Sequence, residues 1–154
     1  MRRAIELARG RLGQTGDNPA VGCVLVKGEV VLTEAVTAPS GRPHAEEQAL
    51  AAAGEAARGA TAYVTLEPCG ERTDGTYSCA ERMLAAGLAR VVYAYGNPDT
   101  RSAGRGPERL RADDVAVESG VLAEEAAAVY ADFMASTKKG GADGAALSRQ
   151  SRTK

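Results

Sequence analysis

The stretch TAYVTLEPCGERTDGTYSCAERMLAAGLARVVYAY, residues 61–95, contains a predicted strand, a helix and a second strand in succession. Residues 61–66 and 90–95 are rich in β-branched and aromatic side chains, which favour strands. Between them, Ser78 is a good N-cap for a helix over 78–86, and Gly87 is suited to end that helix. This alternation of strand and helix indicates an α/β fold.

The alternation continues on both sides of this stretch. The other predicted helices cover 2–12, 44–57, 107–112 (with Pro107 in its first turn) and 122–134. The other predicted strands cover 20–26, 30–38 and 115–118, the first two joined by a hairpin turn at 27–29. The resulting order, α-β-β-α-β-α-β-α-β-α, predicts a mixed five-stranded sheet with helices on both faces, a three-layer α/β/α sandwich.

Length and composition predict one domain over 1–136, followed by a tail over 137–154 that lacks hydrophobic periodicity and is predicted to be disordered. The 154 residues include no Trp, one Phe and five Tyr, so Ala, Val and Leu must fill most of the core. We expect close contacts between helices and sheet, because small side chains allow them.

Charge and hydropathy exclude several classes of protein. The formal net charge is −1, which gives no basic face for a nucleic-acid partner. The chain has no apolar run long enough to span a membrane, and its first residues do not resemble a secretory signal. We therefore expect a cytoplasmic protein, in which three cysteines indicate metal binding, catalysis or burial rather than disulfides.

Four residues form a pattern typical of a hydrolytic zinc site. His44 is the only histidine, Glu46 follows it by two residues, Cys69 comes directly after Pro68, and Cys79 begins the predicted helix after Ser78. A catalytic zinc ion takes three protein ligands and leaves a fourth position for water. A nearby carboxylate can then move the proton of that water, a role that suits Glu46. The start of a helix should favour the thiolate of Cys79.

The order His-x-Glu followed by Pro-Cys is the signature of zinc deaminases, although here nine residues rather than two separate the cysteines. Further segments resemble the deaminase domain of the bacterial riboflavin pathway, which acts on a diaminohydroxy-phosphoribosylamino-pyrimidine. They cover residues 1–4, 18–24, 44–46, 59–69, 85–92 and 103–106, within a similarity that runs from about 1 to 135. The resemblance implies a cytidine-deaminase-like α/β/α fold and homodimers or homotetramers. It also implies zinc bound by His44, Cys69 and Cys79, Glu46 as the proton shuttle, and Asn18 in contact with the substrate.

The departures from that family fall on residues expected to contact the substrate. Glu71 replaces a histidine, the loop between the cysteines is one residue longer and lacks a Thr-Pro-Pro run, and Arg72 is a candidate for the family's basic residue. After the fourth predicted strand, Asn97 stands where the family has an aspartate, and Asp99 stands where it has an asparagine. We therefore predict a stand-alone deaminase, without the reductase domain that usually accompanies it, for a small and related amino-heterocycle. Its substrate contacts would be Asn18, Glu71, Arg72, Asn97 and Asp99.

Other interpretations remain open from the sequence. Arg72, Arg101 and Arg105 could bind a substrate phosphate or be solvated loop charges. The enzyme could deaminate another nucleoside, nucleotide or base in salvage or specialised metabolism. Nucleic-acid editing is disfavoured by the neutral charge, and an inactive nucleotide-binding subunit is disfavoured by the presence of Glu46.

The thiols leave two further alternatives. Cys69 and Cys79 could form a disulfide that closes a surface loop. The chain could also be a non-catalytic module stabilised by zinc, in which Cys23 would be the fourth ligand. The strand pattern instead predicts that Cys23 is a small buried residue.

Overall fold

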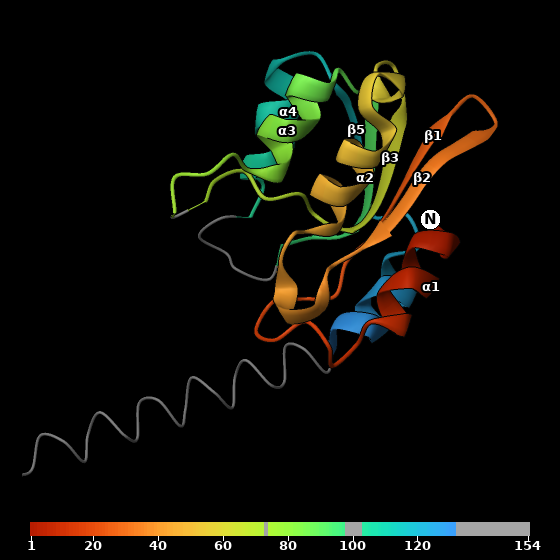
Figure 1. Ribbon diagram of the computed structural model, residues 1–154, viewed down its shortest axis with the longest axis vertical. Helices are drawn as coiled ribbons and strands as arrows, with labels where there is room; N and C mark the ends of the chain where they lie inside the picture. Colours follow the sequence, from red (N-terminus) through yellow and green to blue (C-terminus); the bar gives the residue numbers. More distant parts are fainter. Residues whose placement is uncertain (73, 98–102, 132–154) are drawn as a thin grey trace, which may run out of the picture.

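The computed structural model describes residues 1–72, 74–97 and 103–131, and the predicted tail lies outside them (Figure 1). The helices are α1 (Arg2–Gly10), α2 (Ala45–Ala53), α3 (Cys79–Ala86) and α4 (Arg105–Ala112), with short 3-10 turns at Pro39–Gly41 and Gly54–Ala57. The strands are β1 (Gly22–Lys27), β2 (Val30–Val36), β3 (Thr61–Leu66), β4 (Arg90–Tyr95) and β5 (Ala116–Ser119). Residues 123–131 are also helical. The predicted order of elements is confirmed.

The five strands form one mixed sheet in the order β2-β1-β3-β4-β5. Strand β1 pairs antiparallel with β2 and with β3, whereas β3, β4 and β5 run parallel. The parallel pairs are connected by α3 and α4, as parallel strands require a crossover. The central strands β3 and β4 are largely buried, while β2 and β5 are partly exposed edges.

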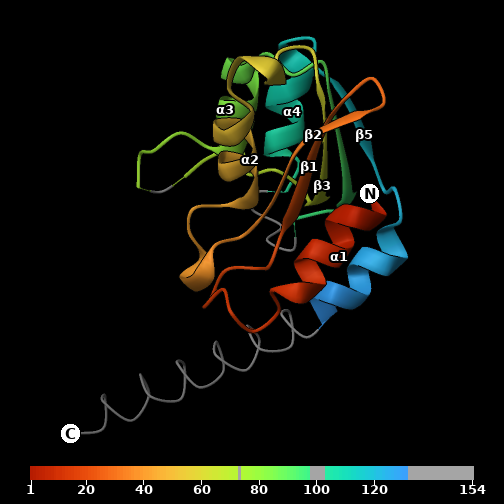
Figure 2. The ribbon, with the colours of Figure 1, turned by 45° about the vertical axis from the view of Figure 1, so that its right-hand side comes forward.

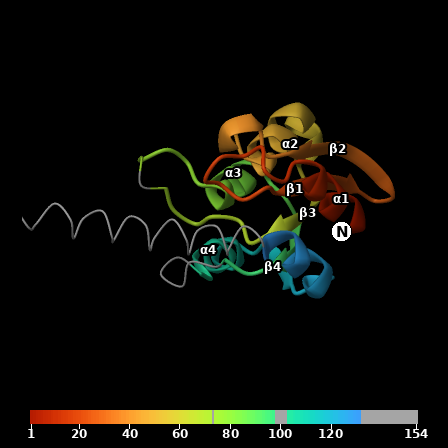
Figure 3. The ribbon, with the colours of Figure 1, turned by 90° about the horizontal axis from the view of Figure 1, so that it is seen from below.

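Helices cover both faces of the sheet, which confirms the three-layer sandwich (Figures 1 and 2). One face packs against α2, α3 and α4 through a core that includes Cys23, Leu25, Ala62 and Val64. On the other face, α1 and the helix at 123–131 lie side by side, as the view from below also shows (Figure 3). As the composition predicted, most side chains in the larger core are Ala or Val. No helix in the described ranges is long and apolar enough to cross a membrane.

The starts of α2 and α4 differ from those predicted. His44 is the N-cap of α2, not its first helical residue, because its backbone is extended and its N–H donates to the Glu47 carboxylate at 2.7 Å. Helix α4 begins at Arg105, two residues before Pro107, following Gly104 in the left-handed conformation (φ 83°). Pro107 still lies in the first turn, where a missing N–H costs nothing.

Gly22 permits the close contact between β1 and α1. A Cβ atom at this position would lie 1.9 Å from the carbonyl oxygen of Ala4, a backbone atom that cannot move without shifting the helix. We expect Gly22→Ala to lower the free energy of unfolding by about 1–3 kcal/mol, as overpacking does. Chemical denaturation measures this change. Gly10→Ala is the matched control, because nothing lies within 4 Å of a Cβ there; equal midpoints for the two variants would contradict the prediction.

Candidate active site

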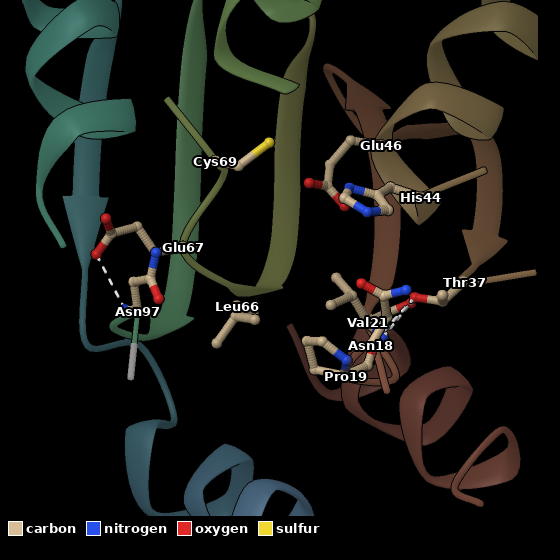
Figure 4. Close-up of a pocket in the computed structure, with 10 residues that line it drawn as sticks. All are labelled: Asn18, Pro19, Val21, Thr37, His44, Glu46, Leu66, Glu67, Cys69 and Asn97. Atoms are coloured by element: carbon tan, nitrogen blue, oxygen red, sulfur yellow. Dashed lines mark hydrogen bonds between the residues drawn. The ribbon is translucent and has the colours of Figure 1, made fainter. Parts of the chain in front are cut away.

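A cavity of about 170 Å³ lies where several elements end at one edge of the sheet (Figure 4). The N-terminal end of α2 contributes His44 and Glu46, and the end of β3 contributes Leu66 and Glu67. The remaining lining residues come from the loop before β1, the end of β2, the segment after β3 and the segment after β4: Asn18, Pro19, Val21, Thr37, Cys69 and Asn97. The cavity therefore brings together residues from both halves of the described chain.

His44 and Cys69, which line this cavity, form a cluster with Cys79. His44 caps α2, Cys79 is the first residue of α3, and Cys69 lies in the loop between β3 and α3. Their potential ligand atoms all lie within 4.8 Å of one another, and His44 Nδ1 is 3.5 Å from Cys79 Sγ. Figure 4 shows the sulfur of Cys69 pointing toward His44 and Glu46. The three side chains can therefore hold one metal ion.

The loop that carries Cys69 is held against α4 by a close backbone approach. A Cβ on Gly106 would lie 1.9 Å from the carbonyl oxygen of Pro68, so only glycine fits at that position. Similarly, a Cβ on Gly70 would lie 2.6 Å from the backbone nitrogen of Gly106. The two glycines allow α4 to support the loop directly beneath Cys69.

The two thiols differ in acidity, and not as the sequence suggested. The pKa of Cys69 is lowered to about 4, first because the Cys79 side chain hydrogen-bonds to it. The backbone N–H of Cys79 also donates to Cys69 Sγ at 3.2 Å. The pKa of Cys79 is raised well above its usual value by the hydrogen bond with Cys69 and by burial. The N–H at the start of α3 therefore stabilises the thiolate of Cys69, not of Cys79.

Glu46 has the environment expected of a general base. Its side chain is almost fully buried, at 4% exposure, and lines the cavity beside His44. Burial raises the pKa of this carboxyl group because the charged form is poorly solvated. Its Oε1 atom has no hydrogen-bond partner among the described residues. An unpaired, buried carboxylate oxygen beside a metal-binding group is suited to accept a proton from a water molecule in the cavity.

The donor set fits zinc. One imidazole nitrogen and two sulfur atoms are ligands that zinc prefers, and three protein ligands leave one position open. Cys23 is not part of this group: it is fully buried in the core on β1. All three cysteines are free thiols, so the structure supports neither the disulfide nor a closed site with Cys23 as fourth ligand. When bound at such a site, zinc supplies a water molecule whose pKa is close to neutrality.

The residues predicted to contact the substrate fall into three groups. Asn18 and Asn97 line the cavity. Glu71 does not: it is 56% exposed and forms an ion pair with Arg105 at 2.7 Å. Arg72 is also absent from the lining and is buried against the metal-binding group. Asp99 and Arg101 lie outside the described residues.

Glu67 is a structural part of the site that the sequence did not indicate as functional. Its buried carboxylate lines the cavity and accepts hydrogen bonds from the backbone nitrogens of Asn97 at 3.1 Å and Gly104 at 2.6 Å. Glu67 thereby fixes Asn97 beside the end of β3. The only available signal was its place directly before Pro68-Cys69, which does not reveal which backbone groups it would meet.

We expect Glu67→Gln to raise the KM for substrate by roughly tenfold, because an amide nitrogen would face one of the two backbone N–H groups. Zinc content should not change, because Glu67 does not touch the metal-binding group. Steady-state kinetics and metal analysis measure these effects. The control is Glu71→Gln on the exposed loop, and an unchanged KM in Glu67→Gln would show that Asn97 does not depend on this anchor.

Together, the fold and the site define a metal-dependent enzyme on a three-layer α/β/α scaffold, with a buried carboxylate next to a His–Cys–Cys group. Residues 1–95 match the family described as the cytidine and deoxycytidylate deaminase zinc-binding region. The chain belongs to this family of zinc-dependent hydrolytic deaminases.

Several of the similar curated proteins are named riboflavin biosynthesis proteins. Riboflavin biosynthesis protein RibD of Escherichia coli is 44% identical over 141 residues, which are 91% of this chain and 38% of that protein. The diaminohydroxyphosphoribosylamino-pyrimidine deaminase of Buchnera aphidicola is 38% identical over 140 residues, covering 91% of this chain and 95% of that protein. The chain therefore spans well under half of RibD but matches the Buchnera deaminase over nearly all of its length.

Solved structures show the same fold. Acinetobacter baumannii RibD matches with a TM-score of 0.81 and 43% identity, over 86% of this chain and 37% of that chain. The Aspergillus oryzae Rib2 deaminase, solved in complex with DARIPP, matches with a TM-score of 0.62 over 77% of this chain and 80% of that chain. Its identity is 22%, so this second likeness shows the fold alone. The predicted cytidine-deaminase-like fold is confirmed.

Proposed function

We propose that this protein removes an exocyclic amine from an amino-pyrimidine by zinc-dependent hydrolysis, as the diaminohydroxyphosphoribosylaminopyrimidine deaminases of riboflavin biosynthesis do. The observation that carries the proposal is the unpaired Oε1 of buried Glu46, which lines one cavity together with the metal-binding residues His44 and Cys69. The relative of similar length supports the choice of substrate class, since it bears the name of that deaminase.

In this proposal, each residue of the site has a separate role. His44, Cys69 and Cys79 would hold zinc, and Glu46 takes a proton from water at its unpaired oxygen. Glu46 delivers this proton to a ring nitrogen as the water oxygen bonds to the carbon that bears the amine. Glu46 then moves the second proton from that oxygen to the amine, and the C–N bond breaks to release ammonia. The raised pKa of Glu46 suits both steps, because a carboxyl group with a pKa nearer neutrality can accept and return a proton. Val21 and Leu66 add apolar surface to the lining of the cavity.

Two amides can recognise the heterocycle. Asn18 and Asn97 line the cavity, and each amide offers both donors and an acceptor, as the edge of an amino-pyrimidine requires. Gly41 leaves room for the Asn18 side chain: with φ 97°, a Cβ there would lie 2.3 Å from Asn18 Nδ2. The ten described lining residues include no Lys or Arg, so they present no cation for a phosphate.

The absence of a cation in this lining favours a second candidate, deamination of a related amino-heterocycle without a phosphate. Glu71, at a position where the riboflavin enzymes carry histidine, is directed to Arg105 and not to the cavity. The two candidates share the same chemistry at Glu46 and differ only in the substrate.

An ammonia-release assay with zinc-loaded protein separates these candidates. The substrates are the diaminohydroxy-phosphoribosylamino-pyrimidine, its dephosphorylated form, cytidine and 2-aminopurine bases. We expect the highest kcat/KM for the phosphorylated pyrimidine. Preference for the dephosphorylated form or a free base would support the second candidate, and no ammonia from any of them would contradict both. Size-exclusion chromatography would test the predicted homodimer or homotetramer.

A further inference from the structure

The pair Glu47–Arg72 is buried beside the metal-binding group, and neither residue lines the cavity. The two side chains are 12% and 6% exposed, and Arg72 Nη2 lies 2.9 Å from Glu47 Oε2. Arg72 Nη1 adds a second contact to Glu47 Oε1 at 3.1 Å, so the pairing is bidentate. Removing two charges from water is costly, and an isolated partner would be more costly still. The arrangement therefore holds Arg72 in one orientation.

That orientation directs the guanidinium at two of the metal-binding residues. Arg72 Nη2 lies 3.2 Å from His44 Nδ1 and 3.8 Å from Cys79 Sγ. The same Glu47 carboxylate accepts the backbone N–H of His44 at 2.7 Å. A single carboxylate thus connects the backbone of one ligand residue to the cation that contacts two ligand side chains.

We propose that Arg72 and Glu47 strengthen zinc binding together: Glu47 fixes the backbone of His44, and Arg72, held by Glu47, is a positioning residue that contacts the sulfur of Cys79 and does not bind the substrate. The inference rests on the proposed zinc site. Groups that hydrogen-bond to metal ligands orient them and tune their affinity, and an Arg contact to a zinc-bound thiolate offsets its negative charge. Arg is suited to this role because it is always charged and its donors form a rigid plane.

The alternative is that Arg72 binds a substrate phosphate, as its place between the cysteines suggested. Three observations oppose it. Arg72 does not line the cavity, its Nη1 and Nη2 atoms are engaged by Glu47 and the ligand residues, and its side chain is almost fully buried. To bind substrate, Arg72 would have to give up its bidentate pairing with Glu47.

Zinc affinity, measured by competition with a chromophoric chelator and without substrate, tests the proposal. We expect Arg72→Met to weaken zinc binding by about 10- to 100-fold, with Arg72→Lys between Met and the native protein. Arg105→Met is the matched control: Arg105 is an exposed cation paired with Glu71, and its loss should change zinc affinity less than twofold. Cobalt substitution provides a spectroscopic readout, since a shifted thiolate-to-cobalt band in Arg72→Met reports altered ligand geometry that a general loss of stability would not produce.

Glu47→Gln provides a second variant if Arg72→Met does not fold. It retains the shape of the side chain but releases the cation, so it should also weaken zinc binding. Unchanged zinc affinity in the folded variants, with a raised KM in Arg72→Met, would overturn the proposal and make Arg72 a substrate contact. Because zinc is titrated without substrate, a wrong substrate assignment would leave this measurement intact.

Discussion

Replacing Glu46 with Gln should lower kcat by about 10²- to 10⁴-fold while zinc remains bound, because the amide cannot accept and return a proton. The substitution preserves size, and Oε1 has no hydrogen-bond partner among the described residues that the change would disrupt. Replacing a buried carboxyl group, whose charged form is poorly solvated, should also maintain or increase stability. Ammonia release, zinc content and thermal unfolding together give the three readouts.

The pattern across these readouts is specific to a proton-transfer role. Glu55→Gln, on an exposed turn, is the control and should leave all three unchanged. Full turnover by Glu46→Gln on a proven substrate would reject the mechanism. Loss of zinc along with turnover would instead make Glu46 part of the metal site.

Replacing Cys79 with Ser should remove zinc and reduce ammonia release to background. Cys79 provides one of three potential ligand atoms that lie within 4.8 Å of one another, and a hydroxyl is a much poorer zinc ligand than a thiolate. Zinc that binds only the folded protein also stabilises it, so the thermal midpoint in the presence of zinc should fall toward that of the metal-free protein. Metal analysis after purification and a thermal scan with and without zinc measure these effects.

Cys23→Ala is the comparison that distinguishes an open catalytic site from a closed structural one. Cys23 lies in the core and outside the metal-binding group, so this variant should keep its zinc and lose only some stability. Zinc lost from Cys23→Ala would restore the interpretation of a four-ligand binding module. Zinc retained by Cys79→Ser would show that the metal lies elsewhere.

Local sequence signals were sufficient for most of the fold. Strands β3 and β4 occupy the predicted residues, because runs such as Thr61–Leu66 combine high strand propensity with clear turn signals. The start of α3 was also predictable, because Ser78 and Glu81 form a capping box. The Ser78 side chain accepts the backbone N–H of Glu81, and the Glu81 carboxylate accepts the backbone N–H of Ser78. The less regular starts of α2 and α4 were not, because they depend on Glu47 and on close backbone packing around Gly106.

The metal-binding residues could be predicted because their identity and order carry the chemistry. A lone histidine, a carboxylate two residues later and a cysteine after proline are informative without coordinates. The roles of the charged residues could not be predicted in this way. Glu71 and Arg72 are adjacent in sequence, yet Glu71 is exposed with Arg105 while Arg72 is buried with Glu47.

The sequence by itself therefore determined the reaction class and the residues of the possible metal site, and it predicted Glu46 as the general base, because metal ligands and a shuttle carboxylate are set by residue type and spacing. Only the tertiary structure decided which thiol is the more acidic, which asparagines line the cavity and what Glu67 anchors. Those properties depend on the burial and partners of each group, and the partners come from segments distant in the sequence. Arg72 shows the difference most clearly: its charge is evident in the sequence, but its contact with His44 and Cys79 exists only in the folded chain.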